Sequence, residues 1–223
     1  ASMRIKGIQL AGLAVVLAGG AAAKDAFADT TVSTATTTPL ATSTAGNVTI
    51  ASGGSIAVTT GQAAVTANGA GLNITNSGAL SSNNANNSAG IVLGSGGSGT
   101  ISSTSSISLV EDYTPTDTDN DGDLDGQFAI GTNRNGILLS SGLFTGNVTS
   151  SGSTTIEGNN SAGILLNGSL IGDLSSTGSM AITGDNTYGI ALTGGLANPL
   201  TGNVNASGGG AIHGANATGL LVG

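Results

Sequence analysis

The sequence predicts an all-β chain wound as a parallel β-helix, and three observations lead to this prediction. Of its 223 residues, 39 are glycine, 7% are charged and 2% are aromatic, whereas 38% are hydrophobic and mostly aliphatic. A short motif recurs along the chain, and its apolar residues lie two positions apart, as on one face of a strand. Aliphatic residues in short strands, glycine-rich turns and an internal repeat are together typical of stacked coils.

Residues 1–28 have the pattern of a secretory signal peptide. Arg4 and Lys6 form a positive segment, residues 7–23 are apolar, and Ala26-Phe27-Ala28 matches a cleavage site. A transmembrane anchor is the alternative, but the strongly apolar part, Ile8 to Leu17, is too short to cross the hydrocarbon core of a bilayer. We therefore expect cleavage after Ala28 and export of the remainder.

The mature chain divides into a Thr/Ala-rich lead-in, residues 29–45, and a repeat region, residues 46–223. The repeat motif is N-x-x-G-[IL]-x-[ILV], with six copies that begin at Asn68, Asn87, Asn133, Asn160, Asn186 and Asn216. Further positions keep the same phase, including G-N-V at Gly146 to Val148 and an isoleucine at Ile156 that recurs at Ile182 and Ile212. Each repeat unit is therefore predicted to hold three short strands, near Val148, near Ile156 and at Ile164 to Leu166.

One repeat unit cannot bury its apolar face alone, so the units are expected to stack and to form a continuous aliphatic core. The motif asparagines would then lie in register, and their side-chain amides would bond from coil to coil. The handedness rule for parallel crossovers favours a right-handed coil. A β-propeller is disfavoured because its blades need about 40 residues or more, and an antiparallel sandwich does not require glycines in register.

The longest interval between motif copies contains an acidic insertion, residues 110–128. It contains Asp117, Asp119, Asp121, Gly122, Asp123 and Asp125, which fit D-x-D-x-D-G, the first half of a calcium loop. Phe128 stands where such loops have a bidentate glutamate. We therefore predict a structural calcium site formed by the five aspartates that borrows a ligand such as Glu111 or Asp112; a solvated acidic loop is the alternative.

Charge and composition argue against several functions. The formal net charge is −8, and Arg134 is the only basic residue after the predicted leader, so nucleic acid is an unsuitable partner. The single histidine, His213, adjoins repeat residue Ile212 and is expected at the surface or in a turn. We predict no catalytic and no organic cofactor-binding residues in this segment.

A signal peptide followed by Gly/Asn/Ser-rich coils with N-x-x-G-I-x-L and G-N-V elements resembles the passenger region of bacterial autotransporters, which are type V secreted outer-membrane proteins. The resemblance covers residues 29–223 and is carried by composition and repeats. It implies a location at the bacterial cell surface or outer membrane, and a C-terminal outer-membrane barrel as a partner within the same chain. On this basis we expect the sequence to be the N-terminal part of a longer protein.

The leading functional hypothesis is a non-catalytic, surface-exposed stalk or adhesin-like passenger that contacts a host surface, an abiotic surface or neighbouring cells. Two alternatives belong to other classes. One is a polysaccharide-acting β-helix enzyme whose site lies outside this segment. The other is a calcium-bound extracellular matrix or S-layer-like protein, which would need more acidic loops than the one found here.

Overall fold

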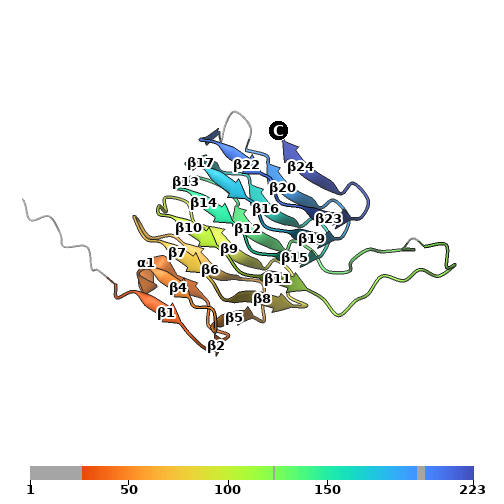
Figure 1. The fold of residues 1–223 in the computed structure, drawn as a ribbon, viewed down its shortest axis with the longest axis horizontal. Coiled ribbons are helices and arrows are strands. Elements are labelled where there is room, and N and C mark those ends of the chain that lie inside the picture. Colours follow the sequence, from red (N-terminus) through yellow and green to blue (C-terminus); the bar gives the residue numbers. More distant parts are fainter. Residues whose placement is uncertain (1–26, 123, 195–198) are drawn as a thin grey trace, which may run out of the picture.

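The chain forms a parallel β-solenoid, as the sequence predicts (Figure 1). The computed structural model describes residues 27–122, 124–194 and 199–223. Except for Phe27 and Ala28, the predicted signal peptide lies outside these residues. Within the described ranges, no helix has the length and apolar character that a membrane crossing requires.

Three seven-stranded sheets, which we call A, B and C, form the walls of the solenoid, and every pairing within them is parallel. Sheet A contains β1 (Thr30–Val32), β4 (Val48–Ile50), β7 (Ile74–Asn76), β10 (Ile101–Ser103), β14 (Val148–Ser150), β18 (Leu174–Ser176) and β22 (Val204–Ala206). Sheet B contains β2 (Ala35–Thr36), β5 (Ser55–Val58), β8 (Ala79–Asn83), β11 (Ile107–Val110), β15 (Thr154–Glu157), β19 (Met180–Thr183) and β23 (Gly210–His213). Sheet C contains β3 (Leu40–Ala41), β6 (Ala63–Ala67), β9 (Ala89–Leu93), β12 (Asn135–Leu139), β16 (Ala162–Leu166), β20 (Tyr188–Leu192) and β24 (Thr218–Val222).

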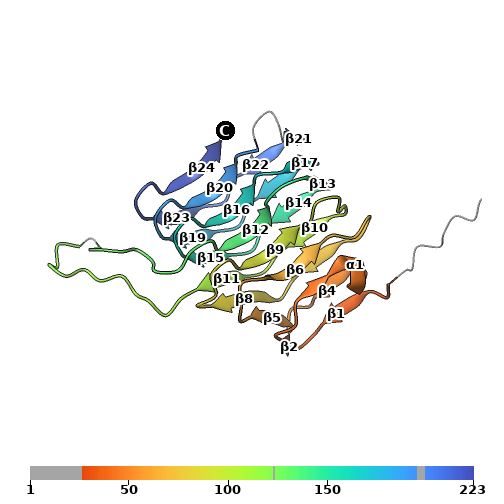
Figure 2. The same cartoon turned by 180° about the vertical axis from the view of Figure 1, so that it is seen from behind.

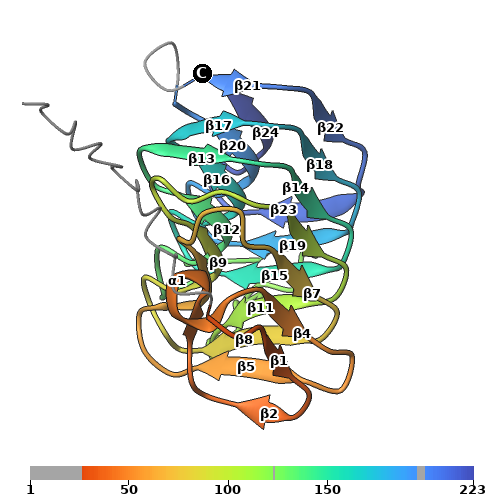
Figure 3. The same cartoon turned by 90° about the vertical axis from the view of Figure 1, so that its left-hand side faces the viewer.

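Two smaller elements complete the fold. A fourth, three-stranded sheet D contains β13 (Leu143–Thr145), β17 (Ser169–Ile171) and β21 (Leu200–Thr201), and it buries Phe144 completely. The four-residue helix α1 (Thr42–Ala45) follows β3 in the first coil. Figure 2 shows the stack from behind, and Figure 3 shows how the strands of each coil run around the solenoid. The predicted lead-in, residues 29–45, supplies β1, β2 and β3 and so forms the first coil.

The predicted core is confirmed. Ile164 and Leu166 of β16 are both buried, while Leu165 between them is half-buried on the outer side. The same alternation gives one continuous aliphatic cluster along the stack, which includes Ile50, Ile74, Ile101, Leu109, Ile137, Ile156 and Ile182. The neighbouring coils supply this burial, and Phe144 is the one aromatic side chain in the cluster of buried residues among the described part of the chain.

Five of the six predicted copies of the repeat motif occupy the same position in their coils. In these five copies the Ile-x-Leu part lies in sheet C, in β9, β12, β16, β20 and β24. The prediction that the first copy, Asn68 to Ile74, occupies the same place is wrong, because its Ile74 lies in β7 and pairs with Val48 and Ile101 of sheet A. The sheet C strand that precedes this copy is β6, whose Ala64 stands level with the motif glycine Gly90 of β9.

The asparagine that begins each of the five copies adopts a left-handed backbone conformation. Its φ lies between 52° and 58° at Asn87, Asn133, Asn160, Asn186 and Asn216, a conformation that asparagine tolerates better than most residues. The predicted amide bonds between coils are confirmed at two steps, where Asn133 donates to Asn87 (3.0 Å) and Asn216 donates to Asn186 (3.1 Å). At a third step Asn160 instead donates to the hydroxyl of Thr132 (3.4 Å).

A second column of side chains bonds the coils more regularly than the motif asparagines do. It lies one residue before each sheet A strand and consists of Asp29, Asn47, Asn73, Thr100, Asn147, Asp173 and Asn203. The Asn73 side-chain oxygen, for example, accepts the backbone N–H of Thr100 one coil further on (2.7 Å), and Asp173 accepts that of Asn203 (2.8 Å). We call this set the Asn/Asp column. It satisfies backbone donors where the chain turns into sheet A.

Replacing Asn73 by leucine is expected to lower the free energy of unfolding by about 1 kcal/mol, because the Thr100 N–H loses its acceptor. Aspartate at the same position is the matched control. It keeps an accepting oxygen, as Asp29 and Asp173 do in the same column, so its effect should be much smaller. Urea denaturation of the two variants measures the difference, and equal losses from leucine and aspartate would show that the acceptor contributes nothing.

Candidate functional site: an acidic arm on a buried ion pair

The acidic insertion leaves the solenoid as a long arm between β11 and β12 (Figures 1 and 2). The coils on either side still meet in register, since Asn135 and Ile137 of β12 pair with Ala89 and Ile91 of β9. The sequence interval of 46 residues between Asn87 and Asn133 is therefore one coil plus the arm, as the spacing predicts. The insertion adds a feature to the side of the solenoid without interrupting its sheets.

A buried ion pair holds the root of the arm. The guanidinium of Arg134 lies 3.0 Å from a carboxylate oxygen of Glu111, and the two side chains are only 1% and 5% exposed. Arg134 also donates to the backbone oxygens of Ala85 and Glu157, one from the preceding coil and one from the following coil. Arg134, the only Lys or Arg among the described residues, thus connects three successive coils at this point.

Glu111 fixes both ends of the arm. Its carboxylate accepts the backbone N–H groups of Ile130 (2.7 Å) and Gly131 (2.6 Å), where the chain returns to the solenoid. Its own N–H donates to the carboxylate of Glu157 (2.9 Å). The entry and exit of the arm are therefore clamped to one carboxylate, which is neutralised by Arg134.

Near its tip the arm folds back on itself. An isolated antiparallel bridge joins Thr116 to Asp125, and the N–H and hydroxyl of Thr118 both donate to the Asp125 carboxylate (2.7 and 2.6 Å). Asp117 accepts the N–H groups of Asn120 (2.6 Å) and Gly122 (3.1 Å), which closes the turn. Asn120 (φ 58°) and Gly122 (φ 98°) supply the left-handed conformations that this turn requires.

The structure brings three of the five predicted metal ligands together. One carboxylate oxygen each from Asp117, Asp119 and Asp125 lie within 4.8 Å of one another. Calcium binds oxygens at 2.3–2.6 Å, so two ligands of one ion lie at most about 5 Å apart, and this group fits that limit. Asp121 is not part of the group, and Asp123 lies outside the described residues.

The two residues expected to lend a further ligand are engaged elsewhere. Glu111 is held in the ion pair with Arg134 at the root of the arm. Asp112 accepts hydrogen bonds from the side-chain amides of Asn83 (2.9 Å) and Asn84 (2.6 Å). The idea that either one completes the aspartate group is therefore not supported. Additional ligands would have to come from water or backbone oxygens, as is common for calcium.

Hydrogen bonds to the charged form lower the pKa of two arm aspartates. The side chain of Asn83, followed by that of Asn84, lowers the pKa of Asp112 below its ordinary value of 3.8. At Asp125 the Thr118 hydroxyl, followed by the Thr118 N–H, lowers the pKa in the same direction. These bonds stabilise the folded arm fully above pH 3.8 and are lost as the pH falls through the lowered pKa of the folded state.

Carboxyl NMR titration is expected to place the midpoint of Asp125 below 3.8, and Thr118→Ala should move it back toward 3.8. Asp112 provides an internal control, since its partners are Asn83 and Asn84 and its midpoint should not respond to the Thr118 substitution. If the Asp125 midpoint is the same in the parent and in Thr118→Ala, the hydrogen bonds to Thr118 do not set this pKa.

Sequence reasoning missed Arg134 and Glu157 as parts of this site. The available signal was the position of the only Lys or Arg after residue 28, in N-R-N-G directly after the insertion, where three other copies have the small residues of N-S-A-G or N-A-T-G. His213 lies exposed in β23, in line with its expected place at the surface.

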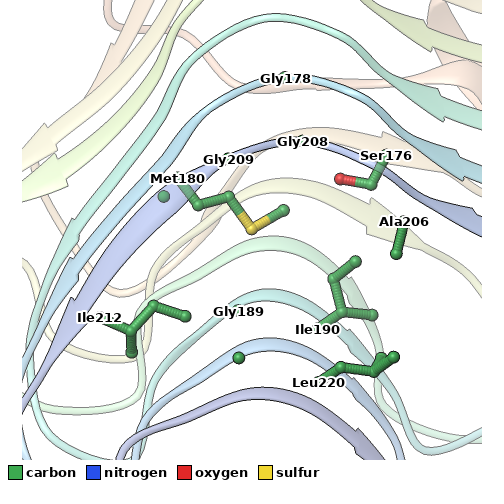
Figure 4. A pocket seen from close by; sticks show the side chains of 12 residues that line it. Ser176, Gly178, Met180, Gly189, Ile190, Ala206, Gly208, Gly209, Ile212 and Leu220 are labelled. Carbon is green, nitrogen blue, oxygen red and sulfur yellow. The ribbon is translucent and has the colours of Figure 1, made fainter.

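A separate apolar hollow lies at the last described coil and has a volume of about 320 Å³ (Figure 4). Its wall consists of glycines and of apolar side chains, among them Met180, Ile190, Ile212 and Leu220. Ser176 supplies its only side-chain hydroxyl. The hollow thus continues the aliphatic interior of the solenoid.

Comparisons of this chain with known proteins find no matching family model, no matching curated protein and no matching solved structure.

Proposed function

We propose that this chain is a non-catalytic, surface-exposed β-helical stalk or adhesin-like passenger of a secreted or outer-membrane bacterial protein. The observation that carries the proposal is the continuity of the stack. Three sheets of seven parallel strands run through the whole described solenoid around a single aliphatic core. Each coil adds a fixed rise of about 4.8 Å, so the architecture sets a rigid length and displays its outer faces along that length.

Export is supported by the predicted signal peptide, and it is tested directly on the precursor. The full chain is produced in a Gram-negative host, and the mature species is analysed by mass spectrometry. Cleavage after Ala28 with the product outside the cytoplasm is the expected result. An uncleaved chain that stays in the cytoplasm would contradict both export and surface location.

The autotransporter part of the proposal has its own test, which is to read the gene beyond the codon for Gly223. A segment of alternating strands of about ten residues with aromatic girdles is the expected translocator barrel. A different anchoring domain would rule out the autotransporter assignment and leave the exported β-helix standing. A domain with clustered carboxylates and aromatic residues would instead favour the polysaccharide-acting enzyme.

We further propose that calcium orders the acidic arm through Asp117, Asp119 and Asp125. The three carboxylates lie close enough to share one ion. A cation between them would relieve the repulsion of like charges at the tip, and affinities of about 10⁻⁴ to 10⁻³ M are typical of extracellular modules. Calcium would act here as a structural ion that stiffens the arm.

Calorimetry with calcium is expected to give saturable binding that Asp119→Asn weakens strongly, because this substitution removes one of the three charged ligands. Asp112→Asn is the matched control, since it removes the same charge from the arm at a residue outside the group. Calcium should also slow proteolytic cleavage of the arm. Equal binding by the two variants, or no heat with the parent chain, would mean that the arm is a solvated acidic loop.

A further inference from the structure

The backbone of the acidic arm is held differently from the backbone of the solenoid. On the solenoid, Asp173 donates its N–H to the Asn/Asp column of the preceding coil. At the tip of the arm, the N–H groups of Asn120 and Gly122 instead bond to the side chain of Asp117 within the same turn. Residues 119–122 are all exposed. An exposed loop tip whose bonds are only local is the kind of segment that a protease can bind and cut.

The composition of the arm restricts the class of protease. Most acidic residues of the chain lie in the insertion, residues 110–128, and this segment contains no Lys or Arg. A protease that selects basic residues finds only Arg134 among the described residues, and that side chain is 1% exposed. An endopeptidase that cuts after aspartate or glutamate finds its sites concentrated in the arm, with Asp119 and Asp121 exposed at the tip.

The parts of the solenoid before and after the arm are joined through all three walls. Across this boundary β9 pairs with β12 in sheet C, β10 with β14 in sheet A, and β11 with β15 in sheet B. The aliphatic core also continues across it, since Leu109 of β11 and Ile156 of β15 stand opposite each other and are both fully buried. The two parts therefore share one core and three ladders of backbone hydrogen bonds.

The clamp at the root of the arm joins the same two parts. Glu111 lies before the tip of the arm, whereas Arg134 and the N–H groups of Ile130 and Gly131, which bond to its carboxylate, lie after the tip. Arg134 also reaches back to the backbone oxygen of Ala85. A cut at the tip would therefore remove the covalent link between the two parts and leave the clamp and the three ladders unchanged.

We propose that the arm is a proteolytic processing site, at which an acid-selective endopeptidase converts the chain into a two-chain solenoid. In the cut after Asp119, water adds its oxygen to the Asp119 carbonyl carbon, and the bond from that carbon to the Asn120 nitrogen breaks. The nitrogen takes up a proton and becomes a new amino terminus. One product carries β1 to β11, the other carries β12 to β24, and the two stay associated. This processing depends neither on the proposed surface role nor on calcium.

The first test is limited digestion of the purified chain with glutamyl endopeptidase in calcium-free phosphate buffer, where this enzyme cuts after both glutamate and aspartate. Mass spectrometry identifies the products. Within residues 46–223, cutting is expected only in the arm. Glu157, Asp173 and Asp185 of the solenoid are the internal controls and should stay uncut until every chain has been cut in the arm. An arm that resists cutting, or equally fast cutting at the three control residues, would overturn the proposal.

The second test asks whether the two products remain one solenoid. After the cut they should elute together from a size-exclusion column at the volume of the uncut chain, with an unchanged circular dichroism spectrum. The urea midpoint of the cut protein should rise with protein concentration, because its unfolding separates two chains, whereas the midpoint of the uncut chain should not depend on concentration. Separation of the products in buffer without urea, or a concentration-independent midpoint after the cut, would rule out a two-chain solenoid.

Discussion

Replacing Arg134 by alanine is expected to lower the free energy of unfolding by about 3–5 kcal/mol, the usual loss when one partner of a buried ion pair is removed. Glu111, which is 5% exposed in the parent chain, would be left with no cation beside it, and the backbone oxygens of Ala85 and Glu157 would lose a donor. Urea denaturation measures the loss. Because Glu111 also clamps the arm, amide exchange at Ile130 and Gly131 should become faster in the same variant.

A double-mutant cycle with Glu111→Ala separates the interaction energy of the ion pair from the other effects of the two substitutions on stability. The two single substitutions should together cost much more than the double substitution, because the double variant leaves no buried charge unpaired. Arg134→Lys keeps the charge but cannot reproduce the several donors of the guanidinium, so its loss should be intermediate. Additive losses in the cycle would show that Arg134 contributes to stability independently of Glu111.

The coil could be predicted from the sequence because its determinants are local and repeated. The alternation at Ile164 and Leu166 identifies an inward face, and recurrence of the same pattern at Ile190 and Leu192 implies stacking. The excess length between Asn87 and Asn133 likewise identifies the arm, since the coils on both sides keep their register. These signals can be read from the sequence without knowing which residues contact each other in the folded chain.

The parts that could not be predicted depend on contacts between coils. The heptapeptide at Asn68 to Ile74 matches the motif by composition, but its phase is set by the pairing of Ile74 with Val48 and Ile101. Arg134 and Glu111 lie 23 positions apart in the sequence, and no periodic signal links them. The residues of the Asn/Asp column recur in the sequence. Their side-chain oxygens, however, accept N–H groups that lie one coil away, and the sequence of a single repeat unit does not show these partners.

At the predicted metal group, pattern and geometry agree only in part. The D-x-D-x-D-G spacing identifies Asp117 and Asp119 through the local turn that they share. Asp125 joins them because the arm folds back on itself and Thr118 holds its carboxylate in place. The clamp at the root fixes both ends of the arm, so we expect Arg134→Ala to loosen the fold-back and to weaken the proposed calcium binding at the tip, although none of the three predicted ligands is changed.

Replacing Gly172 by alanine is expected to destabilise the solenoid by about 3 kcal/mol or more, through backbone strain and overpacking together. Its φ of +143° lies in a region that residues with a Cβ rarely adopt. An added Cβ would also lie 2.2 Å from the Gly146 carbonyl oxygen of the preceding coil. Neither group can move freely, because the Gly146 N–H bonds to Ile171 and the Gly172 N–H bonds to Thr201 in the next coil.

The matched control is Gly209→Ala, where an added Cβ meets no atom within 4 Å and φ lies outside the positive region, so the change should be nearly neutral. Since each coil is stabilised mainly by its neighbours, the Gly172 substitution should also split one cooperative transition into two, with separate melting on either side of β18. Hydrogen exchange in sheet A strands β7 and β22 would report the larger N-terminal part and the smaller C-terminal part. If the Gly172 and Gly209 variants unfold with the same midpoint, close approach of the coils does not require glycine at this corner.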